Sequence, residues 1–243
     1  MRERLLQPAY FLHTRPFKES SALIECFSRD EGLFSCVAKG AKRPKSKWRA
    51  LVQPFILVQI AWTGKGEVKT VVQLEAEGLL PMLSGKVLWI GFYMNELILN
   101  LLHRSDPHPE LFDNYHESLR KIAAEKEEPK IQWILRRYEC TLLKALGFGL
   151  DFDQDIHGEP ILEELVYGYD PEKGFYPHAI LPQSKQIPLS SGATLLALKE
   201  TGQFQNSEQI REAKYLMRFV IAQQLGNKQI KSRKVLAHLL EKE

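Results

Sequence analysis

The sequence predicts an α+β protein in which a small five-stranded β-barrel is followed by a mainly α-helical domain. Two observations carry this fold class. Up to about residue 80, short apolar segments alternate with turn residues, which is typical of small all-β domains. From Lys86 onward, apolar residues recur at helical spacing instead. We therefore predict a barrel domain over residues 1–80 and a helical domain over residues 81–243.

Turn residues divide the first domain into five expected strands. These strands cover residues 9–13, 21–27, 33–38, 55–62 and 67–74. Asp30-Glu31-Gly32 joins the second strand to the third, and Gly64-Lys65-Gly66 lies between the fourth and the fifth. Five short strands with a long loop after the third suit a compact barrel such as the OB-fold, which commonly binds single-stranded nucleic acid.

The helical domain begins with three helices and continues into an irregular segment. The helices are expected over residues 87–102, 109–124 and 129–146. An acidic insert follows at about residues 150–188, where a short hairpin is expected to turn across Asp170-Pro171-Glu172-Lys173. Helices are expected again from near Ser190, Ser207 and Lys228.

Charge is distributed unevenly along the chain. The formal net charge is +3, whereas residues 1–80 hold 13 Lys and Arg against 8 Asp and Glu, a balance of +5. Three scattered cysteines are too few for a disulfide framework. The first residues do not read as a secretory leader, and no apolar run approaches the length of a membrane span. We therefore expect a soluble, cytoplasmic protein.

The largest share of the positive charge lies in one run, from Lys39 to Arg49. This run of eleven residues contains six cations and no acid, and it stands between two expected strands. A basic loop anchored at both ends is a candidate binder of nucleic-acid phosphates, although a merely solvated loop has the same composition. Trp48 within it either stacks on a base or packs in the core. Lys65 and Lys69 would extend the positively charged surface that begins with Lys39 to Arg49 into a longer basic track.

Catalytic and metal-binding patterns are absent from the sequence. There is no Gly-x-x-x-x-Gly-Lys phosphate loop, no Gly-x-Ser-x-Gly elbow and no His-Glu-x-x-His helix. The seven histidines are dispersed singly. Asp151, Asp153 and Asp155 are spaced like the start of a calcium loop but lack its glycine and its final glutamate. We expect no enzymatic activity, no cofactor and no metal ion.

A second basic feature lies on the third expected helix, where Leu135, Arg136 and Arg137 are adjacent. Spacing alone favours a solvent-exposed helix face. The alternative is a pocket in which Arg grips the terminal carboxylate of a peptide while apolar neighbours hold an aromatic side chain.

Several short segments stand along the chain in an order that is characteristic of one family. They are residues 12–21, 32–34, 37–43, 51–55, 64–70, 83–85, 91–97, 110–113 and 135–139. Each segment is short, but the ordered set is specific, and it covers residues 7–150 best. The set resembles RecO, a family of bacterial recombination mediators and DNA-repair proteins.

The resemblance implies an OB-fold followed by a helical domain, with no enzymatic activity. RecO proteins bind single- and double-stranded DNA and anneal complementary strands. With the partner RecR, they help to load RecA onto strands coated by single-stranded DNA-binding protein.

The resemblance also implies which residues act. The DNA-binding role falls on Arg15, Lys39, Lys42, Arg43, Lys45, Lys47 and Arg49, with Lys65 and Lys69 as further candidates. Leu135, Arg136 and Arg137 resemble the segment that engages the acidic, Phe-ended tail of single-stranded DNA-binding protein. Many members carry a four-cysteine zinc site after this helix, but no cysteine follows Gly149 here, so we expect the branch without zinc.

These observations together predict a DNA-binding mediator of recombination and of the repair of DNA damage, cytoplasmic and associated with the nucleoid. The barrel and the basic loop alone would also permit an RNA-binding or translation-associated OB-fold protein. A nuclease is disfavoured, because it would need acids for Mg²⁺ near the basic run, and the acidic cluster lies far away in sequence.

Overall fold

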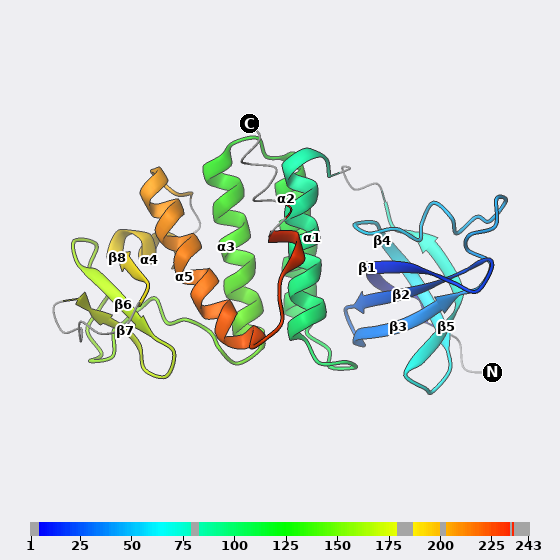
Figure 1. Cartoon of the computed structure of the whole chain (residues 1–243), viewed down its shortest axis with the longest axis horizontal. Coiled ribbons are helices and arrows are strands. Elements are labelled where there is room, and N and C mark those ends of the chain that lie inside the picture. Colours follow the sequence, from blue (N-terminus) through cyan, green and yellow to red (C-terminus); the bar gives the residue numbers. More distant parts are fainter. Residues whose placement is uncertain (1–4, 79–82, 179–186, 200–202, 234, 236–243) are drawn as a thin grey trace. The chain divides into compact units, whose positions relative to one another are not determined.

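The computed structural model describes residues 5–78, 83–178, 187–199, 203–233 and 235 (Figure 1). The chain forms two compact units. One holds the described residues up to Ala123 together with those from Gln229 onward, and the other holds those from Ala124 to Lys228. The expected boundary near residue 80 falls between the last barrel strand and the first helix, inside the first unit.

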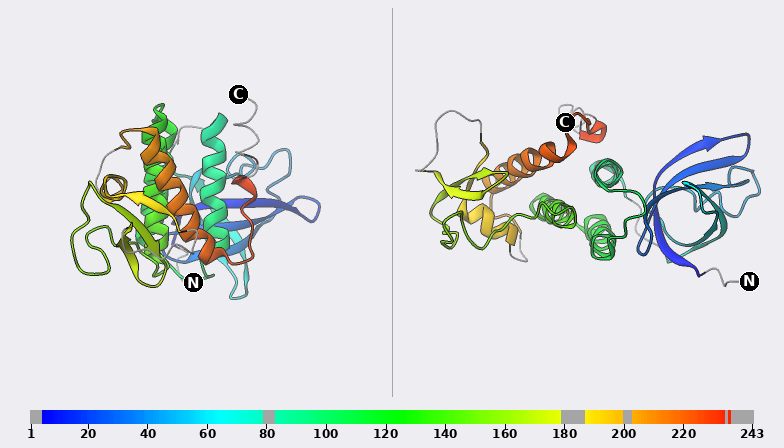
Figure 2. Two further views of the ribbon diagram at one scale, coloured as in Figure 1. Left: turned by 60° about the vertical axis from the view of Figure 1, so that its left-hand side comes forward. Right: turned by 90° about the horizontal axis from the view of Figure 1, so that it is seen from below.

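Five strands of the first unit close into a barrel, which is seen end-on in the right-hand view of Figure 2. They are β1 (Gln7–Phe17), β2 (Ser21–Ser28), β3 (Gly32–Ala38), β4 (Leu57–Thr63) and β5 (Val68–Ala76). The strand order is β1-β2-β3-β5-β4, and β4 returns to pair with β1. Only the β3–β5 pair is parallel. The predicted five-stranded barrel and the α+β class are confirmed.

Strand β3 is buried along its whole length, although only one of its faces points into the barrel. Phe34, Cys36 and Ala38 belong to the barrel core. On the other face, Leu33 is covered by the connection between the first two helices, where Ser105 N–H donates to the Leu33 carbonyl at 2.9 Å. A strand covered on both faces reads as a continuous apolar run, as this one does.

Gly32 permits this close approach. A Cβ atom there would lie 2.2 Å from the Asp106 carbonyl oxygen, and the backbone φ of Gly32 is +72°. Both features require glycine at this position, since a side chain would clash with the backbone and strain the turn.

Helices α1 (Gly85–Leu101) and α2 (Pro109–Ala124) pack in the same unit as the barrel. The ring of Tyr10 on β1 lies 5.0 Å from that of Tyr115 and 5.8 Å from that of Phe112. Asn95 of α1 is buried and donates to the Leu12 carbonyl at 2.9 Å, while it accepts from the Tyr115 hydroxyl at 2.5 Å. These contacts join β1, α1 and α2 into one core.

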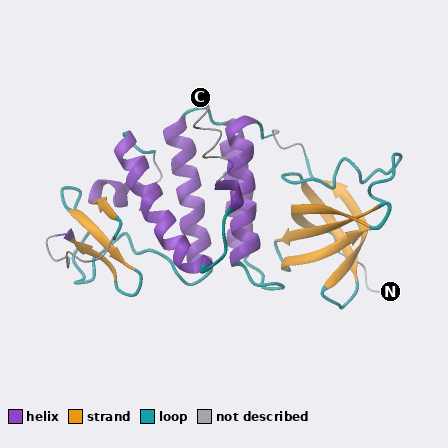
Figure 3. Cartoon of the chain, viewed as in Figure 1, coloured by secondary structure: helices purple, strands orange, loops and turns teal. Residues whose placement is uncertain are grey.

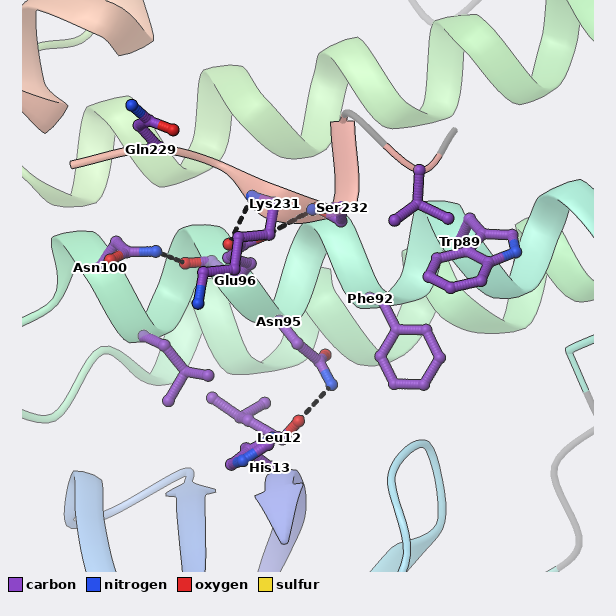
Figure 4. A pocket seen from close by; sticks show the side chains of 12 residues that line it. Leu12, His13, Trp89, Phe92, Asn95, Glu96, Asn100, Gln229, Lys231 and Ser232 are labelled. Carbon is purple, nitrogen blue, oxygen red and sulfur yellow. Dashed lines mark hydrogen bonds between the residues drawn. The ribbon is translucent and has the colours of Figure 1, made fainter. Parts of the chain in front are cut away.

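Residues near the C-terminal end of the chain pack against α1 (Figure 4). The Glu96 carboxylate accepts hydrogen bonds from Lys231 N–H at 2.7 Å and from Ser232 N–H at 2.9 Å. Residues 231–233 are helical, and the first amides of a helix lack partners inside it, so Glu96 caps this turn from another helix. Beyond residue 233, only Val235 of the helix expected from Lys228 is among the described residues.

The second unit combines helices with a small sheet (Figure 3). Its helices are α3 (Glu128–Ala145), α4 (Gly192–Lys199) and α5 (Ser207–Leu225), and its strands are β6 (Val166–Asp170), β7 (Gly174–Pro177) and β8 (Leu189–Ser191). The hairpin across Asp170 to Lys173 is present as β6 and β7.

Strand β8 stands where the sequence suggested the start of a helix. It pairs with β6, and α4 follows it directly. The Glu212 carboxylate of α5 accepts from Ser191 N–H at 3.0 Å and from the Ser191 hydroxyl at 2.8 Å. Three residues are too short a strand to show an alternating pattern, so only the pairing with β6 reveals it.

We predict that Asn95→Ala lowers the free energy of unfolding by about 3 kcal/mol, because it leaves the buried Leu12 carbonyl without its donor and removes an acceptor from the Tyr115 hydroxyl. Urea unfolding followed by circular dichroism measures this loss. The matched control is Asn100→Ala on the same helix, whose side chain donates to the Glu96 carbonyl one turn earlier. Equal losses in the two variants would contradict this role of Asn95.

Candidate nucleic-acid interface

The segment from Lys39 to Ile56, which we call the basic loop, is built from successive tight turns. Arg43 N–H donates to the Gly40 carbonyl at 3.1 Å, Ser46 N–H to that of Arg43 at 3.0 Å, and Arg49 N–H to that of Ser46 at 3.2 Å. Gly40 has a φ of +70°, which lets the chain turn out of β3. The loop is therefore compact, with its own hydrogen bonds.

Apolar side chains of the basic loop fix it to the barrel. Trp48, Leu51 and Val52 pack against the barrel core. The Trp48 indole N–H is buried and has no hydrogen-bond partner within the part of the chain that the structure describes. Of the two roles that the sequence left open for Trp48, the structure favours packing in the core.

A backbone hydrogen bond joins the loop to the β1–β2 hairpin. Lys42 N–H donates to the Ser20 carbonyl at 2.9 Å. Arg15 is exposed on β1, close to the end of this hairpin. The structure thus brings the hairpin that carries Arg15 against the basic loop.

The charged side chains of the loop point into solvent. All six are exposed, and none forms an ion pair or a side-chain hydrogen bond with another described residue. They are Lys39, Lys42, Arg43, Lys45, Lys47 and Arg49. Six unpaired cations on one anchored loop create a local positive potential that attracts polyanions.

Lys69 is not part of this surface. Its side chain is 11% exposed, forms an ion pair with Glu31 and lies over the ring of Phe34 at 4.7 Å. Because Lys69 pairs with Cys36 in the parallel β3–β5 register, it shares the inward face of the barrel. A buried, paired ammonium does not meet phosphate, so the expected role of Lys69 in DNA binding is corrected.

Lys65 is exposed but lies apart from the basic loop. It occupies the turn between β4 and β5, and β5 begins alongside Ser35 in the middle of β3. The basic loop leaves the other end of β3, after Ala38. Figure 1 shows this turn and the basic loop at opposite ends of the barrel. The structure therefore does not extend the basic track to Lys65.

The expected pocket on α3 is not an open one. Leu135 and Arg136 are 3% and 5% exposed, and the Arg136 guanidinium pairs with the buried Glu139 carboxylate at 2.8 Å. Arg137 donates to the Leu198 carbonyl and lies over the Trp133 ring at 5.9 Å. Arg137 thus joins α3 to α4, while Leu135 and Arg136 lie inside the second unit, so the three do not form the open binding surface that was expected.

A basic cluster on α5 is a feature that the sequence alone did not reveal. Burial, together with the charges of Arg218 and Arg136, lowers the pKa of Lys214. Lys214 is half-buried and Arg218 is exposed. We call Arg136, Lys214 and Arg218 the α5 basic cluster. Lys214 and Arg218 are one turn apart on α5, and the packing of α3 against α5 adds the charge of Arg136, which no local sequence pattern shows.

A cavity of about 500 Å³ lies in the first unit, beside the helical turn of residues 231–233 that Glu96 caps (Figure 4). Its lining mixes apolar rings such as Trp89 and Phe92 with His13, Glu96 and Asn100. None of the predicted site residues lies in it.

Metal-binding groups do not gather in the described residues: no three His, Cys, Asp or Glu side chains are placed to hold an ion there. Asp155, from the segment spaced like a calcium loop, instead accepts hydrogen bonds from His157 N–H and Glu159 N–H.

Burial raises the pKa of the Cys140 thiol to about 12. Among the residues that the structure describes, no helix has the length and apolar character of a membrane span.

Comparison with known proteins identifies two matching family models. Residues 1–79 match the model described as Recombination protein O N terminal, and residues 83–234 match Recombination protein O C terminal. The boundary between them falls between β5 and α1.

Curated relatives match over nearly the whole chain. The protein from Halorhodospira halophila is 40% identical over 96% of this chain and 97% of its own length. Those from Azoarcus sp. and Alkalilimnicola ehrlichii are 39% and 40% identical over 97% of this chain, and over 96% and 92% of their own lengths. Each of the three is named DNA repair protein RecO.

We predict that Trp48→Ala lowers the free energy of unfolding by about 2 kcal/mol and makes the basic loop much more sensitive to trypsin, because the loop loses an aromatic side chain that packs against the barrel core. Limited proteolysis followed by mass spectrometry locates the cuts. Trp48→Phe is the control, since it keeps a ring at the core. Equal cleavage of the loop in wild type and Trp48→Ala would show that Trp48 does not anchor it.

Proposed function

Because the chain belongs to the RecO family of DNA repair proteins, we propose that it binds DNA as a mediator of recombinational repair. The observation that carries the proposal is the basic loop, in which six unpaired cations are held on a closed barrel by apolar anchors. The chain makes and breaks no bond in this role. It binds DNA and positions it.

The first step is electrostatic. Lysine and arginine side chains neutralise phosphates and release the counterions that surround the nucleic acid, so affinity falls steeply as salt rises. Such contacts carry no base sequence information. The basic loop and Arg15 therefore supply affinity for single- and double-stranded DNA alike.

Strand annealing follows from the same surface. Two complementary strands repel each other in solution, and a surface that neutralises both allows them to approach and pair. We further propose that, together with RecR, the chain helps to load RecA onto strands coated by single-stranded DNA-binding protein. Family membership supports this step, and on the same ground we propose that the chain acts in the cytoplasm, at the nucleoid.

For the acidic, Phe-ended tail of single-stranded DNA-binding protein, we propose the α5 basic cluster. Lys214 and Arg218 are accessible there, whereas Arg136 adds its charge from within. Tyr215, between them in sequence, is 51% exposed and offers a ring to the terminal Phe. The family resemblance indicated the α3 segment as the tail-binding site. We propose the neighbouring surface of α5 in its place.

The DNA-binding test uses a triple variant, Arg43→Gln, Lys45→Gln and Lys47→Gln. We expect at least about a tenfold loss of affinity for single-stranded DNA near physiological salt. The slope of log affinity against log salt should flatten by about 2, because three phosphate contacts are removed. Fluorescence anisotropy with a labelled oligonucleotide over a salt series measures both, and the annealing rate of complementary oligonucleotides should fall with them.

A second triple variant controls for net charge alone. Lys121→Gln, Lys126→Gln and Lys144→Gln remove the same charge from exposed positions outside the barrel. We expect a loss of affinity of less than about twofold. If both triple variants gave the same salt slope as wild type, the basic loop would not be the DNA-binding surface.

The tail-binding test is Lys214→Gln combined with Arg218→Gln. We expect affinity for a labelled tail peptide to fall at least about tenfold, since two charged partners of its carboxylates are lost. Affinity for naked DNA should stay within about twofold. Arg211→Gln is the matched control, because Arg211 lies on the same helix but pairs with Glu208. Unchanged peptide binding in the double variant would refute the α5 site.

An RNA-binding role is the alternative that a barrel with a basic loop permits. Competition between single-stranded DNA and RNA of matched length and sequence separates the two functions. Preferential displacement of bound DNA by RNA would favour the alternative.

A further inference from the structure

The barrel has a small cavity at the end that the basic loop covers. Its volume is about 290 Å³, just below the range of about 300 to 1,000 Å³ that is usual for ligand cavities. Its lining comes from β1, from β2 and from the basic loop. The residues are Thr14, Ala22, Ala41, Lys42, Arg49 and Val52.

The cavity is held open by contacts already in place. Thr14 and Ala22 stand on paired strands, where Thr14 lies opposite Ile24 and Ala22 opposite Ala38. On the loop side, Lys42 N–H is bonded to the Ser20 carbonyl, and Val52 N–H donates to the Trp48 carbonyl at 3.0 Å. These contacts order both walls before any ligand binds, which lowers the entropic cost of binding.

The chemistry of the lining is divided between mouth and interior. Lys42 and Arg49 are exposed, and neither has an ion-pair partner among the residues described. Ala22 and Ala41 are buried, and Val52 packs on the barrel core. Thr14 adds a hydroxyl that can donate or accept. Two cations suit a phosphate, and small aliphatic groups suit the face of a base or sugar.

We propose that this cavity takes one nucleotide of a DNA single strand, with its phosphate between Lys42 and Arg49 and its base against Val52 and the alanines. The proposal rests on the proposed DNA binding and adds a preference to it. A nucleotide in a duplex is stacked and paired, so it must leave the helix before it can enter a cavity of this size. The exposed cations of the basic loop bind both forms of DNA, whereas the cavity favours single strands.

Val52→Phe tests the cavity without changing charge, because the larger side chain fills it. Anisotropy with labelled oligothymidine and with a duplex of the same length gives the two affinities. We expect affinity for the single strand to fall about tenfold, as for the loss of one base contact, and affinity for the duplex to change less than about twofold. Equal effects on both, or no effect on either, would overturn the proposal.

A pair of charge variants on the same loop provides the matched comparison. Arg49→Gln removes a cation from the mouth of the cavity, whereas Lys47→Gln removes one that does not line it. We expect Lys47→Gln to weaken both forms of DNA by a similar factor and Arg49→Gln to weaken the single strand several-fold more than the duplex. The same behaviour in both variants would count against the cavity.

Two further outcomes are distinguishable. If circular dichroism shows that Val52→Phe is unfolded, Thr14→Val tests the cavity instead. This substitution keeps the shape of the side chain and removes only the hydroxyl. It should weaken single-strand binding about threefold and leave duplex binding unchanged, and no selective loss would overturn the proposal. If the wild-type protein binds neither form of DNA, the proposed function itself fails.

Discussion

The packing of Trp48, Leu51 and Val52 on the barrel core is the interaction on which the rest of the interface depends. Six like charges on a loop repel one another, and an unanchored loop with this composition would be an extended coil. The apolar anchors and the successive turns oppose that repulsion and keep the cations at one end of the barrel. The loop therefore loses its conformational entropy when the protein folds rather than when it binds a ligand.

In the proposed role, the anchored loop serves both single- and double-stranded DNA. The exposed cations meet phosphates of any strand, because a charge has no need of a particular base or groove. We propose that the small cavity behind them admits only a nucleotide that has left its stack. In this proposal, affinity for DNA and preference for single strands come from adjacent but separate groups. The second unit contributes its own charge, through cations that α3 and α5 bring together.

The sequence predicts the barrel well, because its strands are short apolar segments separated by clear turn residues. It also locates the basic loop, since no acid interrupts the run from Lys39 to Arg49. It does not predict the burial of Lys69, because the inward face of β5 is set by its parallel register with β3. For Arg136, a pair of arginines beside an apolar stripe looks like a solvent face. Only the ion pair with Glu139 and the packing of α5 show that it turns inward.

Hydrogen–deuterium exchange of the full chain, with and without a single-stranded oligonucleotide, tests the central claim most directly. Binding at the basic loop should slow amide exchange in residues 39–52 and in the hairpin residues 14–22, because both line the cavity and carry the surrounding charge. Exchange in the β4–β5 turn around Lys65 should not change. Protection confined to other segments, with the basic loop exchanging as fast as in the free protein, would contradict the account.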